Sequence, residues 1–168
     1  MGIFIGVDNG LDGGLIAIDE DGQIIHKTIM PTVGAGASKR ELDLPTILQF
    51  FKGMSGSFQV AGVVLEKGIA MPKQSSVSTF KTGRGIGLIE GIVVALGFRY
   101  QVIAPRTWQK EMLRDLHKTS GNTKQASILA AERLFPGVDW RPTERSKNAH
   151  HGLTDAALMA EYGRRNLK

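Results

Sequence analysis

The stretch Ile3-Phe4-Ile5-Gly6-Val7-Asp8-Asn9-Gly10 runs from an apolar segment into a carboxylate and then into a turn. A short continuous apolar run predicts a buried strand, and Asn-Gly is a strong turn signal. Asp8 therefore stands at the end of a buried strand, where a carboxylate is costly to desolvate unless something pairs with it.

Two further acids stand at the borders of apolar runs. Glu66 closes the run at residues 60–65, and Asp155 opens the run at residues 156–160. Three such carboxylates brought together would repel one another, and a bound divalent cation is the usual remedy. The sequence therefore favours a metal-dependent enzyme.

Length and composition set the class of protein. The 168 residues, 42% of them hydrophobic and 22% charged, fit one domain over residues 1–168. Cysteine is absent, which excludes disulfides and thiolate metal sites. The chain shows neither a basic leader nor an apolar run near 18 residues. We expect no membrane association and a cytoplasmic location in a bacterium or a phage-infected cell, with an organelle matrix as the alternative.

Positive charge is concentrated in the middle and late part of the chain. Residues 67–147 hold 14 Lys and Arg against 6 Asp and Glu, whereas the remaining residues hold 7 against 10. A basic surface around an acidic pocket suits a polyanionic substrate whose chemistry needs metal ions. Solubility alone is the alternative explanation.

Hydrophobic periodicity predicts an α/β protein with a five-stranded mixed sheet, the first three strands antiparallel, flanked by helices. The acids at residues 8 and 66 meet if the first and fourth strands are neighbours, and the last helix then brings Asp155 beside them. The expected strands are 3–8, 15–18, 23–30, 60–66 and 100–103, with a loop at 31–40 and helices at 44–52, 74–96, 105–112, 123–134 and 152–164.

Four segments in this order resemble the ribonuclease H fold and, more specifically, the RuvC-type Holliday junction resolvases, including their small phage and organellar relatives. The resemblance implies a homodimer that binds four-way DNA junctions and makes paired cuts with Mg²⁺ or Mn²⁺. It also implies that Asp8, Glu66 and Asp155 are catalytic metal ligands. The four segments are Ile5-Gly6-Val7-Asp8-Asn9-Gly10, Val64-Leu65-Glu66-Lys67, Ala104-Pro105-Arg106-Thr107-Trp108 and His151-Gly152-Leu153-Thr154-Asp155-Ala156-Ala157.

The chain departs from this family at one position. The family commonly has a fourth acid one turn before the final Asp, where this chain has His151. Residues four apart share a helix face, and a neutral imidazole can bind a divalent metal or relay a proton. We therefore include His151 as a fourth catalytic and metal-binding candidate, which would shift the metal preference toward Mn²⁺.

Each acid also has a structural alternative. Asp8 could cap the turn that follows it, and Asp155 could be a helix N-cap. The small residues Ala156, Ala157 and Ala160 would let the last helix approach a sheet closely and would direct Asp155 inward.

The long helix at residues 74–96 carries Gly83, Gly87 and Gly91, each costing about 1 kcal/mol relative to alanine. We expect them to admit a second copy of the helix in a homodimer. Packing on the protein's own sheet, or a break near Thr82-Gly83, are the alternatives. We expect Phe80 and Trp108 in the core, although Met71 or Phe80 could instead wedge between base pairs.

Basic residues near the expected site are candidates for phosphate contacts, although a solvated surface charge is the alternative for each. They are Lys73, Lys81, Arg84, Lys118 and Lys124.

These features predict a structure-selective endonuclease that resolves four-way and branched DNA junctions by two-metal phosphodiester hydrolysis. Three rivals remain open. One is a ribonuclease H that acts on RNA–DNA hybrids, and one is a non-catalytic junction-binding protein. The third is a phosphotransferase of the sugar-kinase and actin type, because Asp8-Asn9-Gly10 followed by Gly13-Gly14 resembles a phosphate-binding hairpin.

Overall fold

One mixed β-sheet forms the centre of the computed structural model, which describes residues 1–36, 39–69, 75–116 and 121–167. Its strand order is β3-β2-β1-β6-β7. The antiparallel strands β1, β2 and β3 are followed by β6 and β7, which run parallel to β1. The mixed five-stranded sheet is thus confirmed. The strands are β1 (Gly2–Asp8), β2 (Gly14–Asp19), β3 (Ile24–Ile29), β6 (Gln59–Glu66) and β7 (Tyr100–Ile103).

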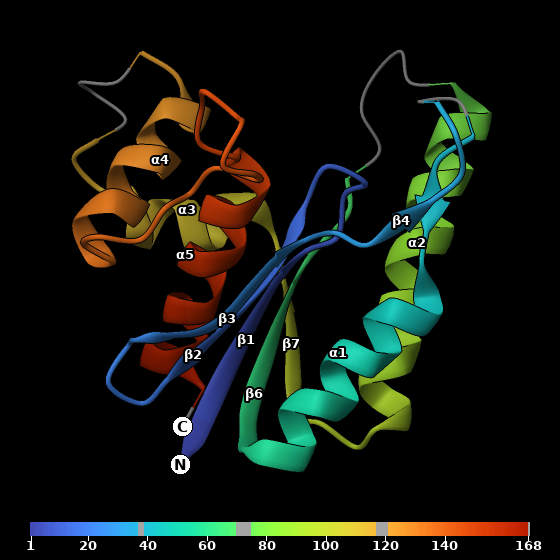
Figure 1. Ribbon diagram of the computed structural model, residues 1–168, viewed down its shortest axis with the longest axis horizontal. Helices are drawn as coiled ribbons and strands as arrows, with labels where there is room; N and C mark the ends of the chain where they lie inside the picture. The colour runs from blue at the N-terminus through green and yellow to red at the C-terminus, as the bar shows by residue number, and fades with distance from the viewer. Residues whose placement is uncertain (37–38, 70–74, 117–120, 168) are drawn as a thin grey trace.

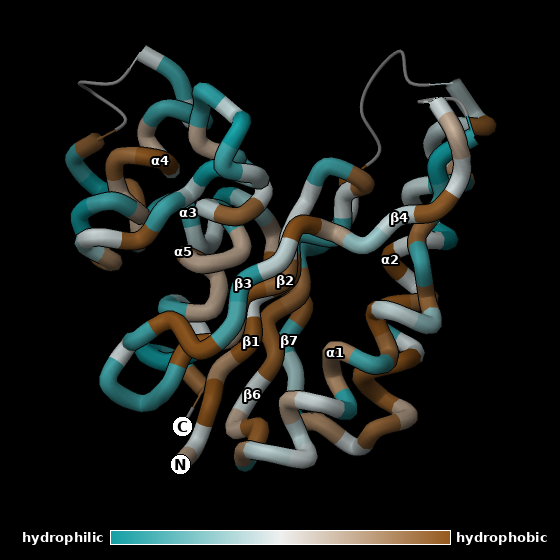
Figure 2. Tube along the Cα trace, in the orientation of Figure 1, coloured by the Kyte–Doolittle hydropathy of each residue, from teal (hydrophilic) through white to brown (hydrophobic). Residues whose placement is uncertain are grey.

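Helices cover both faces of this sheet (Figure 1). On one face lie α1 (Leu44–Ser57) and α2 (Ser76–Ala95). On the other face lie α3 (Pro105–Met112), α4 (Thr123–Leu134) and α5 (His151–Asn166). The hydropathy colouring of Figure 2 shows apolar residues concentrated along the central strands between these two layers.

Strand β1 supplies side chains to both layers because successive residues of a strand point to opposite faces. Ile5 packs in the cluster that contains Phe51 of α1, whereas Phe4 packs in the cluster that contains Ala156 of α5. A strand buried on both sides reads as a continuous apolar run, which explains the sequence that precedes Asp8.

Helix α5 lies unusually close to the sheet. A Cβ atom added at Gly6 would fall closer than 3.0 Å to the carbonyl oxygen of Ala156 and to the backbone nitrogen of Ala160. Glycine on the strand and alanine on the helix therefore let the two backbones touch. The close approach expected from the small residues of the last helix is confirmed.

The loop expected at residues 31–40 contains a feature that the sequence did not indicate. Strands β4 (Thr32–Val33) and β5 (Glu41–Leu42) pair as a short antiparallel ladder. Helix α1 also continues to Ser57 instead of ending at residue 52. Its glycines weaken the helical signal, but Phe51 and Met54 pack on the core and hold the last turns.

Helix α2 is continuous through Thr82-Gly83, so the long helix is confirmed and the alternative of a break there is wrong. Ser75 caps its start by accepting a hydrogen bond from the Ser78 N–H at 3.1 Å. Gly97 follows its end with a φ of +70°, where the left-handed backbone favours glycine. The expectation that Phe80 lies in the core is wrong, because its side chain is 70% exposed on the outer face of this helix. Within the described ranges, no helix is both long and apolar enough to cross a membrane.

Candidate active site

Asp8 and Glu66 lie at the same edge of the sheet. Strands β1 and β6 are parallel neighbours, and Val7 pairs with Leu65, so the next residue on each strand is the acid. Because the carboxyl ends of parallel strands meet at one edge, the side chains of Asp8 and Glu66 are brought toward each other. A direct contact joins the two strand ends: the side-chain amide of Asn9 donates to the carbonyl oxygen of Glu66, 57 positions away in the sequence. The predicted neighbourhood of the first and fourth expected strands is confirmed.

The start of α5 covers this edge. A Cβ atom added at Gly152 would fall closer than 3.0 Å to the carbonyl oxygen of Asp12 in the β1–β2 turn. His150 is the N-cap residue, so Asp155 lies inside the helix and the N-cap alternative is wrong. The close contact at Gly152 sets the first turns of α5, with His151 and Asp155, against the end of β1.

The three carboxylates influence one another electrostatically. Burial raises the pKa of Glu66 to about 7, with repulsion from Asp8 and Asp155 adding to the shift and a hydrogen bond from Trp108 opposing it. Burial likewise raises the pKa of Asp155 to about 7, and the Asp8 charge adds to the rise. Asp8 therefore lies near enough to raise the pKa of both other acids, and this arrangement favours a bound proton or cation over bare negative charges.

Asp8 has a mixed environment. Burial raises its pKa, whereas the Gly10 N–H, which donates to Oδ1 at 3.1 Å, and the positive charge of His151 lower it. The imidazole of His151 stacks on that of His150 with 5.7 Å between ring centroids. His151 is thus near enough to Asp8 to act on its charge, whereas the helical spacing had related His151 to Asp155.

Glu66 is held at two points. The buried indole of Trp108 donates from Nε1 to Glu66 Oε1 at 3.0 Å. The side-chain amide of Asn9 donates to the backbone carbonyl of Glu66. Trp108 lies in the core as expected, but its bond to the site was not predicted, because no local pattern reports a partner 42 residues away.

The donor set fits a hard divalent cation, since carboxylate oxygens are the ligands that Mg²⁺ and Mn²⁺ prefer. Asp155 Oδ1 is buried without a hydrogen-bond partner. The Ser127 hydroxyl is near enough to lower the pKa of this acid, but it makes no hydrogen bond of normal geometry. In the described part of the chain, no group of three or more His, Asp and Glu side chains is arranged so that it could hold a metal ion. The structure thus brings suitable ligand types to one edge of the sheet without assembling three of them in metal-binding geometry.

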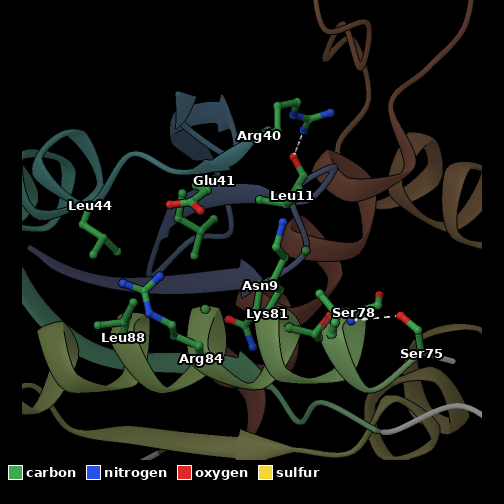
Figure 3. Close-up of a pocket in the computed structure, with 15 residues that line it drawn as sticks. Asn9, Leu11, Arg40, Glu41, Leu44, Ser75, Ser78, Lys81, Arg84 and Leu88 are labelled. Carbon is green, nitrogen blue, oxygen red and sulfur yellow. Dashed lines mark hydrogen bonds between the residues drawn. The ribbon is translucent and has the colours of Figure 1, made fainter. Parts of the chain in front are cut away.

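Lys124 supplies positive charge at the α4 side of this site, where it lowers the pKa of Asp155. Lys81 and Arg84 extend from α2 into a groove of about 480 Å³ on the opposite side. Figure 3 shows this groove between α2 and the segments that carry Asn9 and Arg40. Lys73 and Lys118 lie outside the described residues.

Arg40 is a further basic residue of the groove that the sequence did not single out. Its guanidinium pairs with Asp12 at 2.9 Å and donates to the carbonyl oxygen of Leu11 (Figure 3). It thereby ties the segment before β5 to the turn that follows Asp8. In the sequence it lies in an expected loop, where nothing distinguishes it from a solvated charge.

Comparison with solved structures gives matches over nearly the whole chain. RuvC of Thermus thermophilus in complex with a Holliday junction substrate has a TM-score of 0.65 at 13% identity, with 99% of this chain and 98% of that chain covered. A second T. thermophilus RuvC structure has a TM-score of 0.60 at 16% identity, with 98% and 97% covered. The chain has the fold of the RuvC resolvases.

The yeast mitochondrial Holliday junction resolvase Ydc2 also shares this fold. Its TM-score is 0.55 at 15% identity, with 96% of this chain and 77% of that chain covered. No family model matches the sequence, and no curated protein matches it. The ribonuclease H-like fold expected from the sequence is therefore confirmed by structure, at identities too low for sequence comparison.

Proposed function

We propose that this protein is a metal-dependent endonuclease that resolves four-way and other branched DNA junctions. The main supporting observation is that three partly buried acids, Asp8, Glu66 and Asp155, lie toward one edge of a sheet with the RuvC fold. One protein with this fold is bound to a Holliday junction substrate in its solved structure.

In this proposal Asp8, Glu66 and Asp155 hold Mg²⁺ or Mn²⁺, with His151 in support. Such ions, when bound, lower the pKa of a water nucleophile and stabilise the leaving oxygen of an in-line displacement. The chain's own contribution is to hold the carboxylates in a partly buried site where their charges repel. Asp8, which influences both other acids, is central to the site.

Positive side chains on both sides of the acids would bind the DNA backbone. Lys81, Arg84 and Arg40 line the groove on the α2 side, and Lys124 lies on the α4 side. Phosphates crossing between these sides would pass over the carboxylates. Lys73 and Lys118 remain predictions from the sequence.

We also propose that the protein acts as a homodimer through α2. A Cβ atom added at position 83, 87 or 91 would meet none of the described residues outside its own helix within 4 Å, so the alternative that these glycines pack on the protein's own sheet is wrong. Val77, Phe80 and Val94 are 65%, 70% and 53% exposed. At 100° per residue all six positions fall on one face, which suits a second copy of the same helix. Two-fold symmetry would provide two sites for two cuts.

The deciding experiment incubates the protein with labelled four-way, forked and linear DNA and with an RNA–DNA hybrid, in Mg²⁺, Mn²⁺ or chelator. We expect paired cuts in the four-way junction with either metal and none with chelator. Preferential cutting of the hybrid would favour the ribonuclease H rival. Junction binding without cutting would favour the non-catalytic rival, and ATP binding would favour the phosphotransferase.

The variant Asp8→Asn tests the role of the site. Replacing a residue that hydrogen-bonds to a metal ligand typically lowers metal affinity or activity about 10–100-fold. Loss of a ligand itself should therefore reduce cleavage by more than about 100-fold. Junction binding, measured by gel shift in Ca²⁺, should stay within about threefold because the phosphate contacts are elsewhere. Asp21→Asn, at an exposed position in the β2–β3 turn, is the matched control. Retained cleavage in the Asp8 variant would overturn the assignment.

A further inference from the structure

The two tryptophans of the chain differ in one respect. Both are buried, with exposed fractions of 0% for Trp108 and 3% for Trp140. The indole N–H of Trp108 donates to Glu66 Oε1 at 3.0 Å, whereas the indole N–H of Trp140 has no hydrogen-bond partner among the described residues. A buried indole N–H is a donor that needs an acceptor, and Trp108 satisfies this need with the carboxylate of Glu66.

The ring of Trp108 is fixed by its surroundings. It packs in a core cluster with Ile103 of β7, Met112 of α3 and Leu158 of α5. A side chain enclosed by three elements cannot change rotamer without disturbing them. Its N–H is therefore a stationary donor, and the Glu66 carboxylate that accepts from it is held in one orientation.

A second contact holds the backbone of the same acid. Asn9, 9% exposed, donates from its side-chain amide to the carbonyl oxygen of Glu66. This contact ties the last residue of β6 to the turn that follows Asp8. Backbone and side chain of Glu66 are thus fixed by different residues from different elements.

We propose that Trp108 is a positioning residue that occupies Oε1 of Glu66, so that Oε2 is the oxygen presented to a divalent cation. The proposal rests on the metal-dependent function proposed above. Among the described residues, Oε2 accepts no hydrogen bond. Glu66 would consequently bind a cation through one oxygen, and removing the indole N–H would free the carboxylate to rotate.

The first test observes the contact directly. The ¹H–¹⁵N spectrum should contain two indole signals, which Trp140→Phe assigns. Titration with Mg²⁺ should shift the Trp108 signal and leave the Trp140 signal in place, and Glu66→Gln should remove the response. A Trp108 signal that ignores Mg²⁺ under conditions where calorimetry detects Mg²⁺ binding would overturn the proposal.

The second test removes the donor. Trp108→Phe keeps a buried ring without the N–H, and Trp140→Phe is the matched control because its N–H bonds nothing. We expect Mn²⁺ binding, measured by calorimetry, to weaken about tenfold in the first variant and to stay within about twofold in the second. If Trp108→Phe fails to fold, benzothienylalanine at position 108 replaces only the N–H by sulfur and gives the same comparison.

The outcomes separate this proposal from the proposed function. Equal Mn²⁺ affinity in the two tryptophan variants would overturn the positioning role, even if the protein cuts junctions. Tenfold weaker Mn²⁺ binding in Trp108→Phe would support the positioning role, even if no branched DNA is cut.

Discussion

At the scale of single residues, the acids of the site oppose folding at neutral pH. The pKa of Glu66 is raised to about 7 by burial and by its acidic neighbours, against an ordinary value of 4.5. The folded state therefore retains a proton that the unfolded chain releases. This contribution to the free energy of unfolding is fully present below pH 4.5 and is lost as the pH rises to about 7.

Glu66→Gln should therefore be more stable than the parent protein at pH 8 in chelator. We expect the free energy of unfolding to rise by about 1–2 kcal/mol. This is less than the full pKa shift of Glu66 would give, because the acids of the site titrate as a coupled group. Urea unfolding at pH 4.5 and pH 8 measures it. The difference between variant and parent should shrink at the lower pH, and an equal difference at both would contradict the prediction.

Glu161 is an acid with the opposite effect. Only 4% exposed, it accepts hydrogen bonds from Arg164 at 2.7 and 2.8 Å and from Arg165 at 2.7 Å. Burial alone would raise its pKa, but these two arginines bring it below the ordinary value. Its contribution to stability is present above pH 4.5 and is lost as the pH falls through the lowered pKa.

Glu161→Ala should be strongly destabilising, because it removes an almost fully buried carboxylate that accepts hydrogen bonds from Arg164 and Arg165. The expected loss is about 3 kcal/mol in urea unfolding at pH 7, as is typical when one member of a buried ion pair is removed. Glu132→Ala, at an exposed position of α4, should change stability by less than about 0.5 kcal/mol. Similar losses in both variants would show that the arginines are held by other contacts.

Residue-level chemistry was only partly predictable from the sequence. The acids at the ends of apolar runs could be identified, because burial of a carboxylate at such a position requires a reason. The bond between Trp108 and Glu66 depends on the packing of α3 against the sheet, and no local pattern encodes that packing. The role of Arg40 was not predicted for the same reason, because its partners Leu11 and Asp12 become its neighbours only in the folded chain.

At the scale of elements, the contact between β1 and α5 assembles the site. Gly6→Ala would place a methyl group against the backbone of α5 at Ala156 and Ala160. Neither atom can move without shifting the helix that carries Asp155. We expect a loss of about 3 kcal/mol or more in thermal unfolding, together with weaker Mn²⁺ binding.

Gly53→Ala is the matched control for this prediction. Gly53 lies within α1, and an added Cβ there meets nothing within 4 Å. Alanine should stabilise the protein by about 0.5–1 kcal/mol, because it lowers the conformational entropy of the unfolded chain and has a higher helix propensity than glycine. A comparable loss in both variants would argue against the tight β1–α5 contact.

Elements with one dominant pattern were predicted well, and those with several patterns were not. The strand at residues 100–103 was predicted with the bounds that the structure has. Phe80 was misplaced because apolar residues of α2 occur on more than one face of the helix. The β4–β5 ladder has two residues per strand, too few for any alternation to appear.

At the scale of the whole molecule, the exposed face of α2 predicts a dimer. Gly87→Glu should disrupt it, because each copy would bring a bulky charge to the place where the two helices approach. We expect the sedimentation coefficient at micromolar concentration to fall from that of a dimer to that of a monomer, with junction binding weakened at least tenfold. Gly53→Glu, which adds the same charge elsewhere, should leave the dimer intact. A parent protein that sediments as a monomer would contradict the prediction.

Helix α5 is the last element in chain order, and it contributes both to the core and to the acids of the site. A nascent chain on the ribosome therefore has β1 and β6 before it has the helix that covers them. Until α5 is synthesised, the two strand-end acids lack Asp155, and β1 and β2 lack the helix that packs against them. We therefore expect a fragment that ends before α5 to lack both the core packing that this helix supplies and the side chain of Asp155, so that neither the fold nor the proposed site would be complete.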